Sequence, residues 1–106
     1  MRSMKVCQNH DSTAVLFLDR DISNEARIME IGDELNRIAS NVPPGGELVL
    51  DFQNLAFFTT AMIGQLVQLR KAVQKNGAKL TLRNVSATIQ DVFRVMRLEQ
   101  VFHVES

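Results

Sequence analysis

Short apolar runs alternate with helix-like periodicity along this chain. Runs typical of β-strands cover residues 4–8, 13–18, 47–52, 79–83 and 101–104. Between them, apolar side chains recur at every third or fourth position, as they do on one face of an α-helix. This alternation predicts an α/β fold with four to five strands.

Three helices are expected between these strands. The first follows Ser23, a good N-cap residue, the second runs from about Thr60 to Lys75, and the third follows Ser86. Gly77, just past the second helix, is suited to the left-handed conformation that often ends a helix. A strand, a helix and a strand within residues 47–83 form a βαβ unit, which predicts parallel strands joined by a right-handed crossover.

The run Leu48-Val49-Leu50 is the strongest strand signal in the chain. Because it is short, apolar and uninterrupted, it predicts a central strand that is buried on both faces. Leu48 and Leu50 are expected on one face and Val49 on the other. Asp51 follows this run, and its carboxylate is expected to accept a hydrogen bond from the next loop.

Two phenylalanines and two threonines stand where the second helix is expected to begin. Phe57 and Phe58 precede Thr59 and Thr60, and we expect one phenyl ring to pack under the helix and the other to be exposed. A helix N-terminus has unpaired N–H groups and the positive end of the helix dipole. A threonine hydroxyl there is either a simple cap or a place where negative charge can be added, and both interpretations stay open at this point.

Composition narrows the class of protein. The chain of 106 residues is long enough for one domain, which we place at residues 1–106. Its 12 basic and 12 acidic residues cancel, and it has no Trp or Tyr, so nucleic-acid binding is not expected. The N-terminus does not resemble a signal peptide, and no apolar window is long enough to span a membrane. We therefore expect a cytoplasmic protein without a membrane partner and not the tail of a transporter.

Candidate catalytic residues are few. His10 and His103 show no metal-ligand spacing, and Cys7 is a lone cysteine with no histidine motif around it. No glycine-rich phosphate-binding motif precedes a helix. We expect a protein that is not an enzyme and that holds no metal and no cofactor.

The second half of the chain resembles a known family. Residues 48–102 read LVLDFQNLAFFTTAMIGQLVQLRKAVQKNGAKLTLRNVSATIQDVFRVMRLEQVF. The strand ending in Asp51, the helix end at Asn76-Gly77 and the segment from Leu80 to Val85 follow the order seen in STAS domains. This is the family of bacterial anti-sigma factor antagonists, which also supplies the cytoplasmic tails of sulfate transporters. The resemblance extends over nearly the whole chain.

The resemblance implies a mixed sheet of four to five strands, with three to four helices packed mostly on one face. It also implies a function: the dephosphorylated domain binds an anti-sigma factor that is itself a serine/threonine kinase, and this kinase ends the interaction by phosphorylation. The family motif Asp-Ser-Ser-Gly-Leu-Gly aligns with residues 59–64. Thr60 is then the phosphorylated position, with Thr59 as the alternative.

The partner surface implied by the resemblance combines two segments. The loops at the carboxyl ends of parallel strands meet at one edge of the sheet, so we expect the turn before the first helix to lie beside the start of the second. The expected partner-binding residues are Asp21, Ser23, Asn24, Phe58, Thr59, Thr60, Ala61 and Met62. The alternative is a scaffolding STAS protein that assembles with other STAS proteins and is never phosphorylated.

Overall fold

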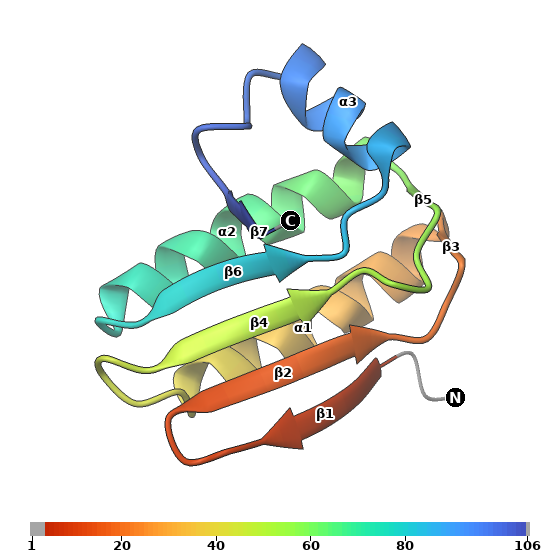
Figure 1. The fold of residues 1–106 in the computed structure, drawn as a ribbon. Helices are drawn as coiled ribbons and strands as arrows, with labels where there is room; N and C mark the ends of the chain where they lie inside the picture. The colour runs from red at the N-terminus through yellow and green to blue at the C-terminus, as the bar shows by residue number, and fades with distance from the viewer. Residues whose placement is uncertain (1–3, 106) are drawn as a thin grey trace.

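The computed structural model describes residues 4–105, which form a five-stranded sheet and three helices. In chain order the elements are β1 (Met4–Gln8), β2 (Ser12–Phe17), β3 (Asp21–Ile22), α1 (Glu25–Ser40), β4 (Glu47–Asp51), β5 (Phe57–Phe58), α2 (Thr60–Lys75), β6 (Lys79–Arg83), α3 (Ala87–Val95) and β7 (His103–Glu105). The main sheet has the order β1-β2-β4-β6-β7, in which only β1 is antiparallel to its neighbour (Figure 1). The predicted α/β fold with a mixed sheet is confirmed.

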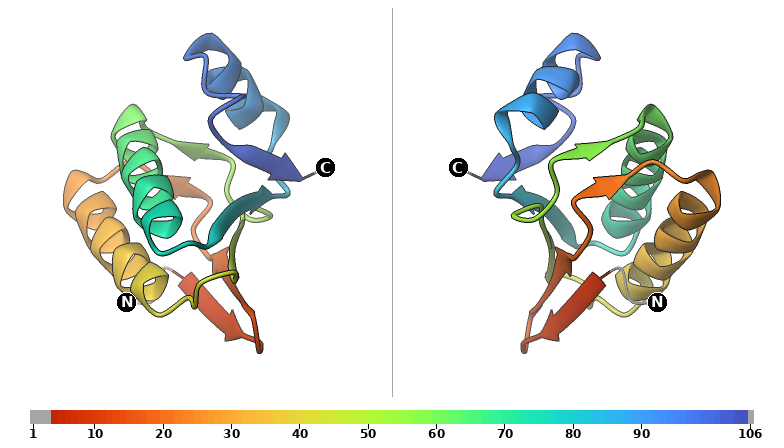
Figure 2. Two further views of the ribbon diagram at one scale, coloured as in Figure 1. Left: turned by 90° about the vertical axis from the view of Figure 1, so that its left-hand side faces the viewer. Right: turned by 90° about the vertical axis from the view of Figure 1, so that its right-hand side faces the viewer.

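The strand order explains why the helices share one face of the sheet. From β2 onward each new parallel strand is added on the same side of the previous one. Because crossovers between parallel strands are right-handed, a sheet that grows in one direction places its helices on one face. Figure 2 shows α1 and α2 side by side on that face, with α3 beyond the edge formed by β6 and β7.

The opposite face of the sheet is open along β2 and β4, although not at β6, where Thr81 is buried, and this corrects one expectation. Leu48 and Leu50 are fully buried under the helices, as predicted, but Val49 is only half-buried on the open face. The strand β2 shows the same alternation, with Val15 and Phe17 buried and Ala14 half-buried. The prediction for β4 was wrong because a strand is buried on both faces only when helices pack on both sides of the sheet. In this structure α1 and α2 pack on one side.

A row of five phenyl rings crosses the core from the sheet to the C-terminal segment. The ring centroids of successive members are 5.3, 6.0, 6.4 and 5.3 Å apart, distances typical of interacting aromatic pairs. The members, in spatial order, are Phe17, Phe52, Phe58, Phe93 and Phe102, and all five are buried. The row therefore connects β2, the residue that follows β4, β5, α3 and the segment before β7.

The last strand, β7, has fewer residues than expected and begins further along the chain. β7 begins at His103, whereas the sequence predicted either a short closing strand over 101–104 or an apolar tail over the core, and Phe102 is indeed buried in the core. The backbone N–H groups of Val101 and Phe102 both donate to the carbonyl oxygen of Leu98, so these two residues belong to a turn. None of the helices within residues 4–105 is long and apolar enough to cross a membrane.

The one-sided burial of β4 gives a direct test of the architecture. Leu50→Ala should lower the free energy of unfolding by about 2–5 kcal/mol, because it leaves a cavity under the helices. Val49→Ala, on the same strand but on the open face, should cost about 1 kcal/mol or less. Urea unfolding followed by circular dichroism measures both values, and equal losses for the two variants would contradict the one-sided core.

Candidate functional site

Two segments far apart in the sequence meet in a small second sheet. β3 pairs in parallel with β5, so that Asp21 lies opposite Phe57 and Ile22 opposite Phe58. The carbonyl oxygen of Arg20 accepts hydrogen bonds from the N–H groups of Ala56 (2.8 Å) and Phe57 (3.2 Å). The turn before α1 is thereby held against the start of α2, as the sequence predicted.

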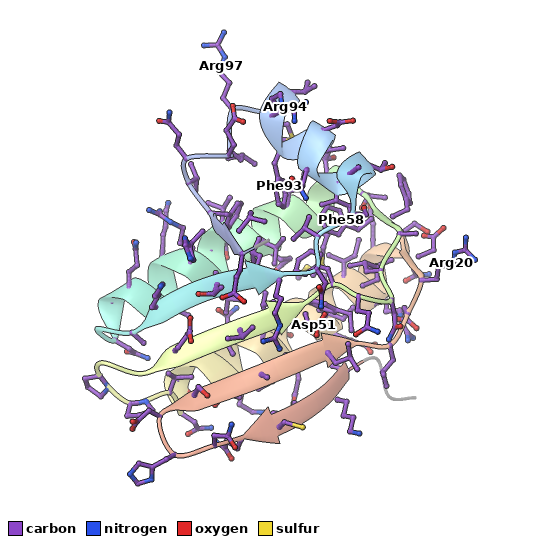
Figure 3. The ribbon with its side chains drawn as sticks, in the orientation of Figure 1. Arg20, Asp51, Phe58, Phe93, Arg94 and Arg97 are labelled. Atoms are coloured by element: carbon purple, nitrogen blue, oxygen red, sulfur yellow. The ribbon has the colours of Figure 1, made fainter. Side chains whose placement is uncertain are left out.

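The two faces of this small sheet differ. Ile22 and Phe58 point into the core, whereas Asp21 and Phe57 are exposed, Phe57 with 49% of its surface accessible. Figure 3 shows Phe58 directed toward Phe93 of α3. The expectation that Phe58 contacts a partner is therefore wrong, and Phe57 is the aromatic side chain that the surface presents.

The start of α1 is firmly capped, although not by the residue expected. The Oδ1 atom of Asn24 accepts a hydrogen bond from the N–H of Arg27 at 3.0 Å, so Asn24 and not Ser23 is the N-cap. Ser23 remains exposed on the surface. Arg27 also forms an ion pair with Asp19, with 2.7 Å between Nη2 and Oδ2, which fixes the turn to the first helical turn.

The start of α2 lacks such a cap. Thr59 occupies the N-cap position with extended backbone angles, but its side chain accepts no hydrogen bond from the helix. The first turn of α2 also contains no acidic residue, in contrast to Glu25 at the start of α1. The N–H of Met62 donates to the carbonyl oxygen of Thr59 at 3.0 Å, but no side chain caps this end of α2 and no acid of the first turn balances the positive end of the helix dipole.

Thr59 and Thr60 differ in how much of their surface is exposed to solvent. Thr60 and Ala61 are exposed, Thr59 is half-buried, and Met62 is fully buried in the core. The expectation that Met62 belongs to the partner surface is therefore wrong, because its side chain packs inward. Of the two hydroxyl groups, that of Thr60 lies on the more accessible residue.

Exposed residues that the sequence analysis did not select adjoin this surface. Met29 of α1 is 58% exposed, and its Sδ atom lies 3.7 Å from Nε2 of Gln65, one turn along α2 from Ala61. Periodicity alone could have found Met29, because it falls off the buried stripe of α1. We name the surface formed by Asp21, Ser23, Asn24, Met29, Phe57, Thr59, Thr60 and Ala61 the helix-start surface.

Behind this surface, the ends of two neighbouring strands are linked by side chains. Asp51 accepts hydrogen bonds through Oδ1 from the N–H of Gln53 (2.9 Å) and from Nδ2 of Asn84 (3.0 Å). The expected hydrogen bond from the following loop to the Asp51 carboxylate is confirmed. Asn84 adopts a positive φ of 57°, which Asn tolerates better than most residues. These contacts hold the loop that leads from β4 to β5 in place.

Comparison with known proteins identifies the family. The family model described as STAS domain matches residues 5–106. This chain belongs to the STAS domain family. No curated protein matches its sequence.

Several solved STAS structures have the same fold at low sequence identity. An anti-sigma-factor antagonist (STAS) domain protein from Planctomyces limnophilus has a TM-score of 0.86 and 19% identity, over 97% of this chain and 89% of that one. The anti-sigma factor antagonist SpoIIAA in its unphosphorylated form has a TM-score of 0.73 and 12% identity, over 97% and 87%. The phosphorylated form of SpoIIAA, described as a Bacillus cell fate determinant, has a TM-score of 0.72 and 12% identity, over 97% and 91%.

STAS folds also occur within larger proteins. The murine solute carrier 26 family member A9 anion transporter matches with a TM-score of 0.65 and 19% identity, over 92% of this chain but only 16% of the transporter. The fold alone therefore does not assign one function to a STAS domain.

The segment on which the family motif is expected to align, residues 59–64, spans the N-cap and the first turns of α2. Thr59, Thr60 and Ala61 of this segment belong to the helix-start surface, whereas Met62 and Ile63 are buried. Gly64, its last residue, is exposed, and a Cβ atom built there has no other atom within 4 Å. Neither packing nor backbone conformation within residues 4–105 therefore requires a glycine at this position.

The unequal capping of α1 and α2 predicts unequal effects of substitution. Asn24→Ala should lower the free energy of unfolding by about 1 kcal/mol, because it removes the cap of α1. Thr59→Ala should change it by only a few tenths of a kcal/mol, because Thr59 makes no capping hydrogen bond. Thermal unfolding of both variants measures the difference. A loss of similar size in Thr59→Ala would indicate that its hydroxyl caps α2.

Proposed function

We propose that this STAS domain is an anti-sigma factor antagonist. In this proposal the helix-start surface binds an anti-sigma factor of the serine/threonine kinase type in the cytoplasm, and phosphorylation of Thr60 ends the binding. The domain acts by binding and not by catalysis. The observation that carries the proposal is the exposed Thr60 at the uncapped start of α2, beside the turn that precedes α1.

Electrostatics supports Thr60 as a switch. A phosphate adds about −1.5 to −2 charges at neutral pH. The first turn of α2 carries no acid, and a helix N-terminus stabilises an anion by about 0.3–1 kcal/mol, so the domain can hold the phosphate without unfolding. A partner seated on the same surface has to desolvate the phosphate dianion or oppose it with its own charges, and either event weakens binding.

The comparisons support the idea that this fold tolerates the modification. Structures of SpoIIAA are known in both an unphosphorylated and a phosphorylated form, and both resemble this chain to a similar degree. Thr59 replaces the acid of the family motif, so a kinase that modifies Thr60 has to recognise it without a preceding aspartate. The half-buried position of Thr59 makes it the less accessible of the two threonines.

The decisive experiment concerns Thr60. The domain is purified from its native cell with the proteins that it binds, and a kinase-like anti-sigma factor found there is used as the partner. Binding to this partner should be lost in Thr60→Asp and kept in Thr60→Ala, while both variants keep the melting temperature of the parent within a few degrees. Mass spectrometry after incubation with the kinase and ATP should find one phosphate, on Thr60.

A matched control separates the switch from a general effect of charge. Thr88 is also exposed and also lies in the first turn of a helix, α3, which contributes no residue to the helix-start surface. Thr88→Asp should therefore bind the partner like the parent. Intact binding in Thr60→Asp, together with no phosphate on Thr59 or Thr60, would contradict the proposed switch. Recovery of other STAS proteins in large assemblies would then favour the scaffolding alternative.

A second test uses Gly64, which lies one helical turn from Thr60 on the same side of α2. An exposed glycine inside a helix is less stable than alanine by about 1 kcal/mol, and an added methyl group meets no atom of this chain. Gly64→Ala should therefore raise the stability of the domain. It should also weaken partner binding, because the methyl group projects into the space that the partner occupies. Unchanged binding in this more stable variant would show that the partner does not approach α2 closely.

A further inference from the structure

The charges of this neutral chain are distributed unevenly. Residues 52–90 contain no acidic residue but five basic ones: Arg70, Lys71, Lys75, Lys79 and Arg83. Residues 1–51 contain nine acidic and five basic residues. The second half of α2 and the strand β6 that follows it therefore carry a local excess of positive charge.

A groove opens beside this basic segment. It has a volume of about 490 Å³ and is lined by the second half of α2, the beginning of β6 and the turn before β7. Half-buried Ala78 and Val101 contribute apolar surface to it, together with Leu80 and Phe102, which are almost fully buried. The groove lies where β7 has not yet paired with β6, because their pairing begins only at Thr81 and His103.

The basic residues of the groove have no acidic partners. Arg70 and Lys79 line the groove, and neither forms an ion pair with any acid among residues 4–105. Glu99 is the single acidic residue of the lining, and Nε of Arg94 lies 4.0 Å from its Oε2 atom. The charge of Glu99 is thus partly balanced from outside the groove, while the charges of Arg70 and Lys79 are not.

We propose that this groove binds an extended acidic segment of a protein partner. Arg70 and Lys79 pair with its carboxylates, and an apolar side chain of the segment rests on Ala78 and Val101. A protein segment fits better than a small anion because the groove is open to solvent and encloses too little of a small molecule to bind it well. Lys71 and Lys75 do not line the groove, but both are exposed on the same half of α2 and add to the positive charge near it.

This site is separate from the helix-start surface. Arg70 and Gln74 lie about 15–21 Å along α2 from Thr60, at a rise of about 1.5 Å per residue. The proposal therefore does not depend on phosphorylation or on the identity of the anti-sigma factor. It gives the domain a second contact, with a different partner or with a distant segment of the same one.

The test uses a fluorescent peptide, Glu-Glu-Leu-Glu-Glu, and the intact domain at low ionic strength. Fluorescence anisotropy should show binding, and the uncharged peptide Gln-Gln-Leu-Gln-Gln should bind at least tenfold more weakly. Shifts of backbone amide signals in NMR spectra should concentrate at residues 70–80 and 99–103. Shifts spread evenly over all basic residues would overturn the proposal, because they indicate attraction without a site.

Matched variants complete the test. Arg70→Gln/Lys79→Gln should weaken peptide binding at least tenfold, whereas Lys5→Gln/Arg37→Gln, with the same change in net charge away from the groove, should weaken it less than twofold. Thr60→Asp should bind the peptide like the parent, which separates this site from the proposed switch. Equal losses in the two double variants would overturn the proposal. Displacement of the peptide by inorganic phosphate or AMP at lower concentration than unlabelled peptide would also overturn it, in favour of a small-anion site.

Discussion

The row of five phenyl rings is the contact on which the rest of this structure depends. It passes from β2 and β4 through Phe58 to α3 and the C-terminal segment. Each buried ring contributes about 1.5–3 kcal/mol from the removal of apolar surface from water, and each ring pair about 0.5–1.5 kcal/mol more. A helix as short as α3, with nine residues, is not stable alone in water, so its packing through Ile89 and Phe93 holds it in place.

The same row fixes the position of the helix-start surface. Phe58 packs between Phe52 and Phe93. Because Thr59 follows Phe58 directly in the chain, this packing fixes the backbone at the beginning of α2. The core therefore fixes the position of Thr60 and leaves this residue accessible. A switch residue needs this combination, because added charge can then change what binds at the surface while the packing beneath it stays the same.

The sequence predicted the parts of this fold that depend on the periodicity of apolar residues. The buried stripes of α1 and α2 and the parallel crossover between β4 and β6 all follow from the spacing of apolar residues. The sequence could not show that Val49 lies on the open face of the sheet, because the order of all the strands determines which faces of one strand are buried. It also could not decide between Phe57 and Phe58, since this choice is set by the two-residue pairing of β5 with β3. That pairing joins residues 36 positions apart, and no local pattern in the chain indicates it.

The uneven distribution of charge has a consequence for how copies of this domain behave together. With 12 basic and 12 acidic residues, the molecule has no net charge to keep its copies apart, but Arg70 and Lys79, which form no ion pair within residues 4–105, make the groove locally positive. Such a molecule is turned by the field of a charged neighbour before contact, over distances of about one Debye length, or roughly 8 Å at physiological ionic strength. Salt shortens this distance, so the orientation in which two molecules first meet depends on the ionic strength of the surroundings.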